Sequence, residues 1–354
     1  MGETNQLPSL TKISWNVPEI EYRQSLALSY SKIAKYSREG YRTLFDEIKI
    51  DTDSLRFGSL VDCLLTEPET FDSRFIVLEM TIPSELIVKI INQIYDSLET
   101  KIPNIYEIPR EYILKFIVEN NYYPNWKEDT RINKIIDEGV TYFKSLFDKG
   151  DKTAITKEEY TDAVACVEEL KNNEYTAKLV NDENDINIEH LYQQKFILEE
   201  PYHVRCMFDK LIVNHIDKTI QPIDFKTSHN NEEDFRSSFM TWGYHIQASL
   251  YSYILQEICK KDEYFSQFKI LPFKFIVINR YSKSPIVWQF KPYNQILLAG
   301  TYEQITDYGK KIKPWFELYD EINYYYVTQD IRYSKETRES NGIREIDTIN
   351  IQLI

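Results

Sequence analysis

Glycine and paired cysteines are scarce in this chain of 354 residues, and long apolar runs are missing. Only 9 glycines occur, and neither G-x-G-x-x-G nor G-x-x-x-x-G-K-[ST] is present, which argues against a glycine-rich nucleotide loop. The four cysteines form no C-x-x-C pair, which argues against a zinc ribbon, an iron–sulfur cluster or a secreted disulfide framework. No apolar run approaches the roughly 20 residues that span a bilayer, and the first residues do not resemble a signal peptide. We therefore expect a cytoplasmic protein with no membrane partner.

Aromatic residues and acidic charge are abundant instead. The composition is 42% hydrophobic and 14% aromatic, with 27 tyrosines, which is typical of a globular protein with a sizeable core. The formal net charge is -14, whereas proteins that hold a polyanion usually have a basic surface. A nucleic-acid site on this chain must therefore be a local feature.

The spacing of apolar residues predicts helices first and strands later. Helices are expected over residues 26–45, with Ser25 as N-cap, over about 54–65, and through most of 84–99 and 128–180. Short segments rich in β-branched and aromatic residues predict an antiparallel meander of three strands over 190–198, 203–213 and 219–227. A helix over about 232–260, strands over 273–280 and 285–291, and a helix over about 294–316 follow. The run Tyr324, Tyr325 and Tyr326 is interpreted as a core or interface strand.

This order predicts an α/β (α+β) fold with a central mixed sheet flanked by helices. Four segments are expected: N-terminal helices (1–75), a mostly helical insertion (76–188), the core with the meander (189–320) and a polar C-terminal tail (321–354).

The third strand of the meander carries a carboxylate and an ammonium on one face. Asp224 and Lys226 in I-D-F-K-T-S are two residues apart, and side chains i and i+2 of a strand point the same way. Asp209 lies in the preceding strand, and hairpin pairing would bring it close to Asp224. Two carboxylates so close favour a bound cation, and oxygen ligands suit Mg²⁺ or Mn²⁺. Lys226 would then stabilise developing negative charge. Gln247 and Tyr251 are four residues apart and share one face of the next helix, where Gln247 would orient a water and Tyr251 would line the site or contact a phosphate.

At this point the chain resembles a known family. I-D-F-K-T-S, preceded by C-M-F-D-K-L and followed by Y-H-I-Q-A-S-L-Y, is similar to the PD-(D/E)XK nuclease superfamily, and within it to the RecE-like (exodeoxyribonuclease VIII) phage exonucleases. R-F-G-S-L-V-D-C-L-L-T-E-P resembles the first-helix motif of that family, and F-K-F-I-V-I-N-R-Y through P-W-F resembles its C-terminal part. The resemblance covers about residues 25–75 and 188–318.

The resemblance implies a restriction-endonuclease-like core and metal-dependent hydrolysis of DNA. It implies Asp209 and Asp224 as metal ligands together with the main-chain carbonyl of Phe225, and Lys226 as the catalytic lysine, with Gln247 and Tyr251 as accessory residues. Two departures are present: Asp62 stands where the family has histidine, as a further candidate ligand, and glutamines 193 and 194 stand where relatives often have glutamate.

A basic stripe on the N-terminal helix is a candidate DNA contact. Lys32, Lys35, Arg38 and Arg42 recur at spacings of 3, 3 and 4. An ordinary solvated helix face explains the stripe equally well, and phosphate contacts beside the site are the functional reading.

Three functions remain open from the sequence. The first is an Mg²⁺- or Mn²⁺-dependent exonuclease that degrades linear double-stranded DNA, 5′ to 3′ by resemblance, to supply single strands to an annealing or recombinase protein. Relatives form rings, so a homo-oligomer with a basic channel would reconcile the charge of -14 with DNA binding. The second is a structure- or site-specific endonuclease. The third is an inactive DNA-binding or assembly protein, which Asp62 and the two glutamines at 193 and 194 motivate.

Overall fold

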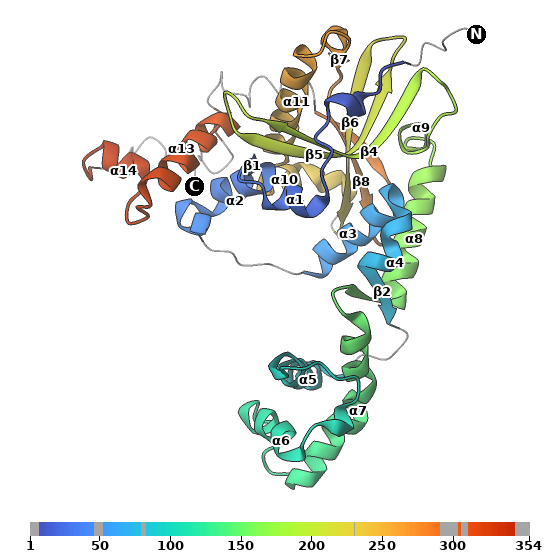
Figure 1. Ribbon diagram of the computed structural model, residues 1–354, viewed down its shortest axis with the longest axis vertical. Helices are drawn as coiled ribbons and strands as arrows, with labels where there is room; N and C mark the ends of the chain where they lie inside the picture. The colour runs from blue at the N-terminus through green and yellow to red at the C-terminus, as the bar shows by residue number, and fades with distance from the viewer. Residues whose placement is uncertain are drawn as a thin grey trace. The chain divides into compact units, whose positions relative to one another are not determined.

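The computed structural model describes residues 7–45, 52–78, 83–229, 231–290, 304–305 and 311–343. The chain divides into two compact units, one formed by residues 1–66 and 165–354 and the other by residues 67–164 (Figure 1). No helix within these described ranges is long and apolar enough to cross a membrane.

The first unit is built on a mixed sheet of seven strands in the order β1-β5-β6-β8-β9, with β4 added beside β5 and β7 beside β6. The strands are β1 (Leu28–Ser29), β4 (Ile188–Leu198), β5 (Val204–Asn214), β6 (Thr219–Ser228), β7 (Lys269–Ile270), β8 (Lys274–Asn279) and β9 (Ile286–Gln289). β4, β5 and β6 form an antiparallel meander, whereas β6 and β8 run parallel. The predicted meander and the predicted mixed sheet are both confirmed.

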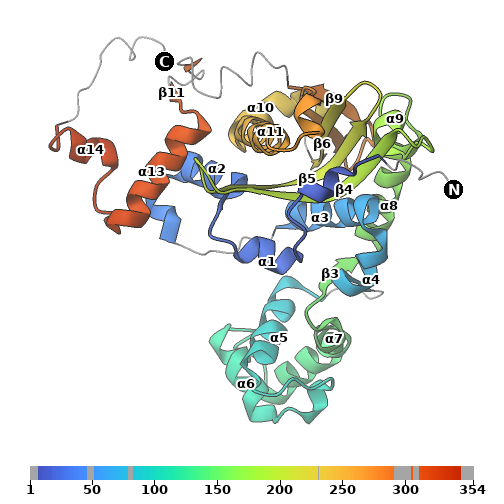
Figure 2. The same cartoon turned by 45° about the horizontal axis from the view of Figure 1, so that its top comes forward.

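Helices cover both faces of this sheet (Figure 2). α11 (Tyr244–Lys260) packs on β4 and β5 and is preceded by α10 (Phe235–Thr241), while α3 (Asp53–Thr66) packs on β5 and β6 from the opposite face. α2 (Tyr30–Glu39) packs against α11 and α13 (Trp315–Thr328). The remaining elements of this unit are the 3₁₀ helices Leu10–Ile13, Tyr41–Phe45, Glu232–Asp234 and Phe265–Gln267, α1 (Glu19–Gln24), the second half of α8 (Lys157–Asn172), α9 (Ala177–Val180), α14 (Lys335–Glu339) and the pair β10 (Gln304–Ile305) and β11 (Lys311–Ile312).

Burial follows the periodicity of these elements. α3 buries Phe57, Leu60 and Val61 against the sheet, and β5 buries alternate residues such as Val204, Cys206 and Phe208. One continuous apolar core joins the sheet to α2, α11 and α13. The site residues described below therefore rest on a rigid scaffold.

Three predicted elements are corrected. The helix expected over 26–45 is interrupted, because Leu28 pairs with β5, α2 begins after Ser29, and Gly40 at φ 86° ends it. The helix expected over about 294–316 falls largely outside the described residues, and its described parts form β10 and β11 before α13 begins at Trp315, directly after Pro314. The tyrosine run 324–326 lies in α13 rather than in a strand.

The unit formed by residues 67–164 is mainly helical. Its elements are a 3₁₀ helix (Pro68–Thr70), α4 (Phe71–Arg74), β2 (Phe75–Leu78), α5 (Glu85–Ser97), a 3₁₀ helix (Ile105–Glu107), α6 (Arg110–Glu119), α7 (Glu128–Lys149), β3 (Thr153–Thr156) and the start of α8. Buried isoleucines such as Ile90, Ile94 and Ile135 form its core. The predicted insertion 76–188 overlaps this unit, although residues 165–188 belong to the first unit.

Candidate active site

The register of the meander places three polar residues in a row across β4, β5 and β6. β5 pairs with β6 from Asn214 to Lys210, where Lys210 faces Ile223, and Asp209 and Asp224 are the next residues on the two strands. β4 pairs with β5 through Tyr192–Lys210 and Gln194–Phe208, so Gln193 lies opposite Asp209. The two aspartates that the hairpin prediction expected to converge are therefore neighbours.

The row lies where the sheet splits. One edge of β5 has two partner strands. Near Lys210 it pairs with β6, and near Val204 and Arg205 it pairs with β1, so Asp209 lies between the segments paired with β6 and with β1. Beyond Ile223, β6 leaves β5 and pairs with β8. Main-chain groups at such a split lack a ladder partner, and the N–H of Phe225 is satisfied instead by the carboxylate of Asp209, at 2.8 Å.

Asp224 is the most buried acid of the row, with 2% of its surface exposed. The Nε2 of Gln247, from α11, donates a hydrogen bond to Oδ1 of Asp224, and the ammonium of Lys226 forms an ion pair with Oδ2. Asp224 and Lys226 therefore share the face of β6 that α11 covers, as the alternation of strand side chains predicts. The exposed fraction of the Lys226 side chain is 20%, so solvent reaches the site at its end.

One tyrosine ring lies over the ammonium of Lys226, and a second packs against that ring. Its Nζ lies 4.9 Å from the centre of the Tyr244 ring, and the ring of Tyr30 lies 6.5 Å from that of Tyr244. Burial opposes the charged form of Lys226, but the neighbouring Asp224 and Tyr244 outweigh it and raise the pKa of the lysine. The lysine is therefore a fixed positive charge rather than a proton donor at neutral pH.

Asp209 experiences the opposite balance. Loss of solvation, followed by the negative charges of Asp224 and Asp62, raises the pKa of Asp209 well above its usual value. Lys226 and the N–H of Phe225 oppose this shift without cancelling it. A site in which carboxylates repel one another in this way is suited to a cation.

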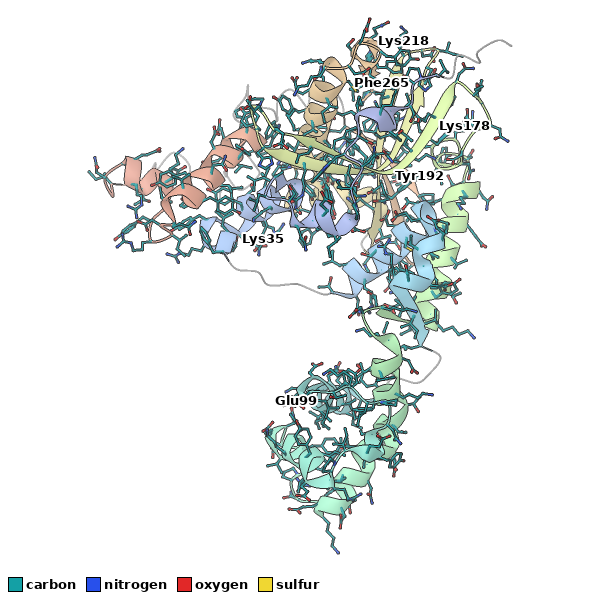
Figure 3. The ribbon with its side chains drawn as sticks, in the orientation of Figure 1. Lys35, Glu99, Lys178, Tyr192, Lys218 and Phe265 are labelled. Carbon is teal, nitrogen blue, oxygen red and sulfur yellow. The ribbon has the colours of Figure 1, made fainter. Side chains whose placement is uncertain are left out.

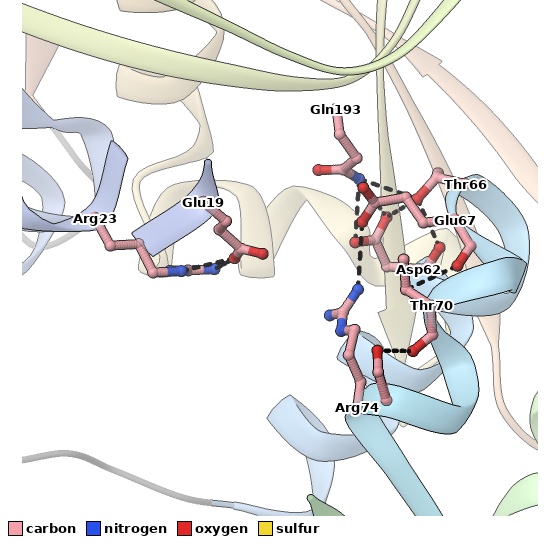
Figure 4. Close-up of polar contacts among 9 residues, drawn as sticks. Glu19, Arg23, Asp62, Thr66, Glu67, Thr70, Arg74 and Gln193 are labelled. Atoms are coloured by element: carbon pink, nitrogen blue, oxygen red, sulfur yellow. Dashed lines mark hydrogen bonds and ion pairs between the residues drawn. The ribbon is translucent and has the colours of Figure 1, made fainter. Parts of the chain in front are cut away.

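Asp62 projects from α3 and is held by Gln193 (Figure 4). The Nε2 of Gln193 lies 3.2 Å and 3.3 Å from the two carboxylate oxygens of Asp62, and 3.1 Å from the hydroxyl of Thr66. Gln193 adopts φ 49°, an unusual conformation for a residue with a side chain, at the point where β4 faces Asp209. Two of the positions that depart from the pattern described above, Asp62 and Gln193, are thus partners of each other.

Tyr251 lies beneath the site rather than at its surface. It is 7% exposed, and its ring packs 5.2 Å from Phe208 and 6.3 Å from Tyr30. Burial raises the pKa of its hydroxyl well above its usual value. The structure thus places Tyr251 in the core that supports Asp224 and Gln247, and its contact with a phosphate stays a prediction.

The four basic residues of the N-terminal stripe do not form one row. Lys32 lies 5.1 Å from the ring centre of Tyr326, whereas the guanidinium of Arg38 lies 5.1 Å from that of Trp242. Arg42 follows the end of α2 and lies near the ring of Tyr41. Lys35 is on α2, between Lys32 and Arg38 in the sequence (Figure 3). Their role in DNA binding stays a prediction.

Sequence reasoning did not place Tyr30 and Tyr244 beside Lys226. A signal for Tyr244 was available, because Tyr244, Gln247 and Tyr251 recur at i, i+3 and i+7 and so share one face of α11. Gln193 was recognised only as a departure, and its contact with Asp62 bridges 131 positions of sequence.

The donor set around Asp224 fits a hard divalent cation. Oε1 of Gln247 is buried without a hydrogen-bond partner, the buried Oδ2 of Asp224 has only its ion pair with Lys226, and Asp209 adds a second carboxylate nearby. Within the described ranges no group of three or more His, Cys, Asp and Glu side chains is arranged to hold a metal. Protein carboxylates alone therefore do not complete the site, and the carbonyl of Phe225 and substrate oxygens would supply the remaining ligands.

Comparison with known proteins agrees with the fold. Residues 33–284, more than two thirds of the chain, match the family described as PDDEXK-like domain of unknown function (DUF3799). A search of functionally curated proteins gives no match. The matched range contains Asp62, Asp209, Asp224, Lys226 and Gln247.

Proposed function

Because the chain belongs to this PDDEXK-like domain family, we propose that it is a metal-dependent deoxyribonuclease that hydrolyses phosphodiester bonds. One observation carries the proposal. Asp224 and Lys226 lie side by side on β6, Asp209 lies near Asp224 where the sheet splits, and Gln247 donates to Asp224 from α11. An isolated surface ion pair would not bury its carboxylate or bind it from a second element.

Each residue has a distinct part in this chemistry. Lys226 is fixed as a cation beside Asp224, where it neutralises negative charge that develops on the phosphate. Gln247 donates through Nε2 to Asp224 and retains a buried, unpartnered Oε1, which can accept a hydrogen bond from the attacking water. The N–H of Phe225 fixes the carboxylate of Asp209 in place. A water molecule attacks the scissile phosphate directly, without a covalent intermediate.

A divalent cation, Mg²⁺ or Mn²⁺, is the expected cofactor. Asp209 and Asp224 would hold it with the carbonyl of Phe225, and Asp62 lies nearby as a further candidate. When bound, the ion supplies Lewis-acid polarisation of the phosphate and lowers the pKa of the attacking water.

The finer proposal is an exonuclease that works 5′ to 3′ on linear double-stranded DNA and leaves a single strand for an annealing or recombinase protein. The resemblance of I-D-F-K-T-S and Y-H-I-Q-A-S-L-Y to the RecE-like exonucleases supports it. A homo-oligomeric ring around DNA would place basic residues inside and acidic residues outside, which is compatible with a net charge of -14. A site-specific endonuclease is the alternative within the same chemistry.

An inactive DNA-binding or assembly protein is the second candidate function. The specific observation that favours it is the Asp62–Gln193 contact, which satisfies with protein hydrogen bonds a carboxylate that is a candidate metal ligand. In that case the fold and a DNA-contacting surface would persist without turnover.

Cleavage of linear and covalently closed circular DNA, with Mg²⁺, Mn²⁺ or EDTA, decides among these functions. An exonuclease shortens only linear DNA, an endonuclease also opens circles, and an inactive protein cuts neither. DNA labelled at the 5′ or 3′ end reports the polarity.

The site assignment is tested with Asp224→Ala and Lys226→Ala. Both variants are expected to lose at least about 100-fold in cleavage rate, since each removes a charge from the site. Asp217→Ala is the matched control, because Asp217 is exposed in the turn between β5 and β6, at the other end of the hairpin. Cleavage by Asp224→Ala at the wild-type rate would sink the assignment.

A further inference from the structure

An exposed tryptophan lies next to the site at the junction of α10 and α11. Trp242 is 49% exposed, although tryptophan side chains are highly buried on average. Of the described elements, α10 ends just before it and α11 begins two residues later, at Tyr244. The proposed function gives Trp242 no part.

The turn that carries Trp242 is rigid. The N–H of Trp242 donates to the carbonyl of Ser238 at 2.9 Å, and Gly243 follows with φ 72°. A Cβ at position 243 would lie 3.2 Å from the Cβ of Ala34, so only glycine fits without a shift. The turn therefore fixes the backbone position from which the tryptophan side chain extends.

Two tyrosines connect Trp242 to the proposed phosphate site. The hydroxyl of Tyr30 donates to the carbonyl of Trp242 at 3.0 Å, and the ring of Tyr30 contacts that of Tyr244. Tyr244 in turn lies over the ammonium of Lys226. Tyr30 and Tyr244 are therefore the two residues between Trp242 and the ammonium of Lys226.

The ring of Trp242 also has a cation beside it. The guanidinium of Arg38 lies 5.1 Å from the ring centre, and its side chain is 33% exposed and paired with Glu39. An aromatic face with an arginine beside it provides both base stacking and a phosphate contact, the combination that single-stranded nucleic acid requires.

We propose that Trp242, backed by Arg38, is a stacking site for an unpaired nucleobase of the DNA strand that enters or leaves the candidate active site. This rests on the proposed function for the location of the phosphate. It adds a residue that recognises single-stranded bases, which neither the match to the PDDEXK-like family nor the Asp-x-Lys motif supplies.

The test measures binding separately from cleavage. The Kd of a labelled oligothymidylate of about ten nucleotides is measured in EDTA, so that metal-dependent cleavage cannot occur. An abasic oligomer of the same length, with the same phosphates, is measured in parallel. Trp242→Ala is expected to weaken binding of the oligothymidylate about 5- to 100-fold and to leave binding of the abasic oligomer unchanged. Trp242→Phe keeps an aromatic face, so it is expected to weaken binding only a few-fold.

Trp126 provides the matched control. It is 42% exposed, but it belongs to the helical unit of residues 67–164 and stacks on Tyr123 with 4.5 Å between ring centres. Trp126→Ala is expected to bind both oligomers as the wild type does. Circular dichroism and size exclusion verify that each variant is folded and report its oligomeric state.

Each outcome supports or overturns the proposal. Equal affinities of the wild type and Trp242→Ala for the oligothymidylate overturn it. If Trp242→Ala also changes the oligomeric state, Trp242 is an interface residue instead. An equal loss on base-containing and abasic oligomers also overturns it, because stacking needs a base. Cleavage by the wild type is scored separately with Mg²⁺ on linear duplex. Base-dependent binding without cleavage supports the stacking site and rejects the nuclease proposal. Cleavage without base-dependent binding supports the nuclease proposal and rejects the stacking site.

Discussion

Replacement of Gln193 by glutamate tests whether the Asp62–Gln193 contact takes the place of a metal-ligand pair. In the wild type, one amide nitrogen donates to both oxygens of Asp62 at 3.2 Å and 3.3 Å. Gln193→Glu keeps the size of the side chain, removes that donor, and places a second carboxylate against the first. The expected result is a loss of stability in EDTA that a divalent cation reverses.

The magnitude follows from two contributions. A hydrogen bond to a charged acceptor stabilises the folded state by about 1.5–3 kcal/mol, and the variant loses it. Two like charges at this separation add a repulsion that solvent screens in part, because Asp62 and Gln193 are only half-buried. The free energy of unfolding at pH 8 in EDTA is therefore expected to fall by about 2–4 kcal/mol.

Urea unfolding at pH 8 and pH 5 provides the assay. At the lower pH the closely spaced carboxylates take up a proton, so the deficit of Gln193→Glu is expected to shrink. Mg²⁺ or Mn²⁺ is expected to stabilise the variant more than the wild type, because the cation offsets the repulsion.

A double-mutant cycle that combines Gln193→Glu with Asp62→Asn isolates the pair. The two substitutions together restore an amide–carboxylate contact with the roles of the two positions exchanged, so the double variant is expected to recover most of the lost stability. Gln194→Glu is the matched control, because the Nε2 of Gln194 donates only to the main-chain carbonyl of Tyr192, at 2.8 Å. If Gln193→Glu is as stable as the wild type, or if its loss is unaffected by Asp62→Asn, the reasoning is refuted.

Three further predictions concern the same unit. In EDTA, Asp209→Asn is expected to gain stability relative to the wild type as the pH rises above the ordinary carboxyl range. The pKa of Asp209 is raised in the folded state, which means that the folded protein holds the proton more tightly than the unfolded chain does. The wild type therefore loses stability as the pH rises towards that pKa. Urea unfolding between pH 4 and pH 8 checks this, and parallel curves for both proteins would contradict it. Lys210→Met is expected to lower the free energy of unfolding by about 2 kcal/mol or more. The fully buried ammonium donates to Asp182, to the carbonyl of Val180 at 2.6 Å and to a tyrosine hydroxyl. An unchanged urea midpoint would show that these hydrogen bonds contribute no net stability. Gly243→Ala is expected to lower the free energy of unfolding by about 1–2 kcal/mol, because alanine is strained at a φ of 72°. It is also expected to weaken binding of single-stranded DNA. Normal binding with lowered stability would show that the turn does not contribute to DNA binding.

Much of the site followed from local sequence pattern. Alternation along a strand placed Asp224 and Lys226 on one face, and a short turn between two β-rich segments predicted that Asp209 would approach Asp224. The resemblance of Y-H-I-Q-A-S-L-Y to the family singled out Gln247, and the structure added its hydrogen bond with Asp224. The inferences from strand alternation and from the turn succeeded because they depend on residues that are close in sequence and on elements with a strict repeat.

The aromatic C-terminal run shows where local pattern misleads. Tyr324, Tyr325 and Tyr326 have high strand propensity, but Trp315, Leu318, Tyr319, Ile322 and Tyr325 are buried at helical spacing in α13. Packing against α2 and α11 decides between the two, and that packing is tertiary.

The sequence by itself determined the order of the elements around the site and the pair Asp224–Lys226, because strand and turn patterns act over a few residues. Only the tertiary structure decided the rest. The split of the sheet at Asp209 depends on β1, a distant segment that displaces β6 from part of one strand edge. The contact between Asp62 and Gln193, and the position of Trp242 beside the Lys226 tyrosines, likewise join segments that only the packed fold brings together.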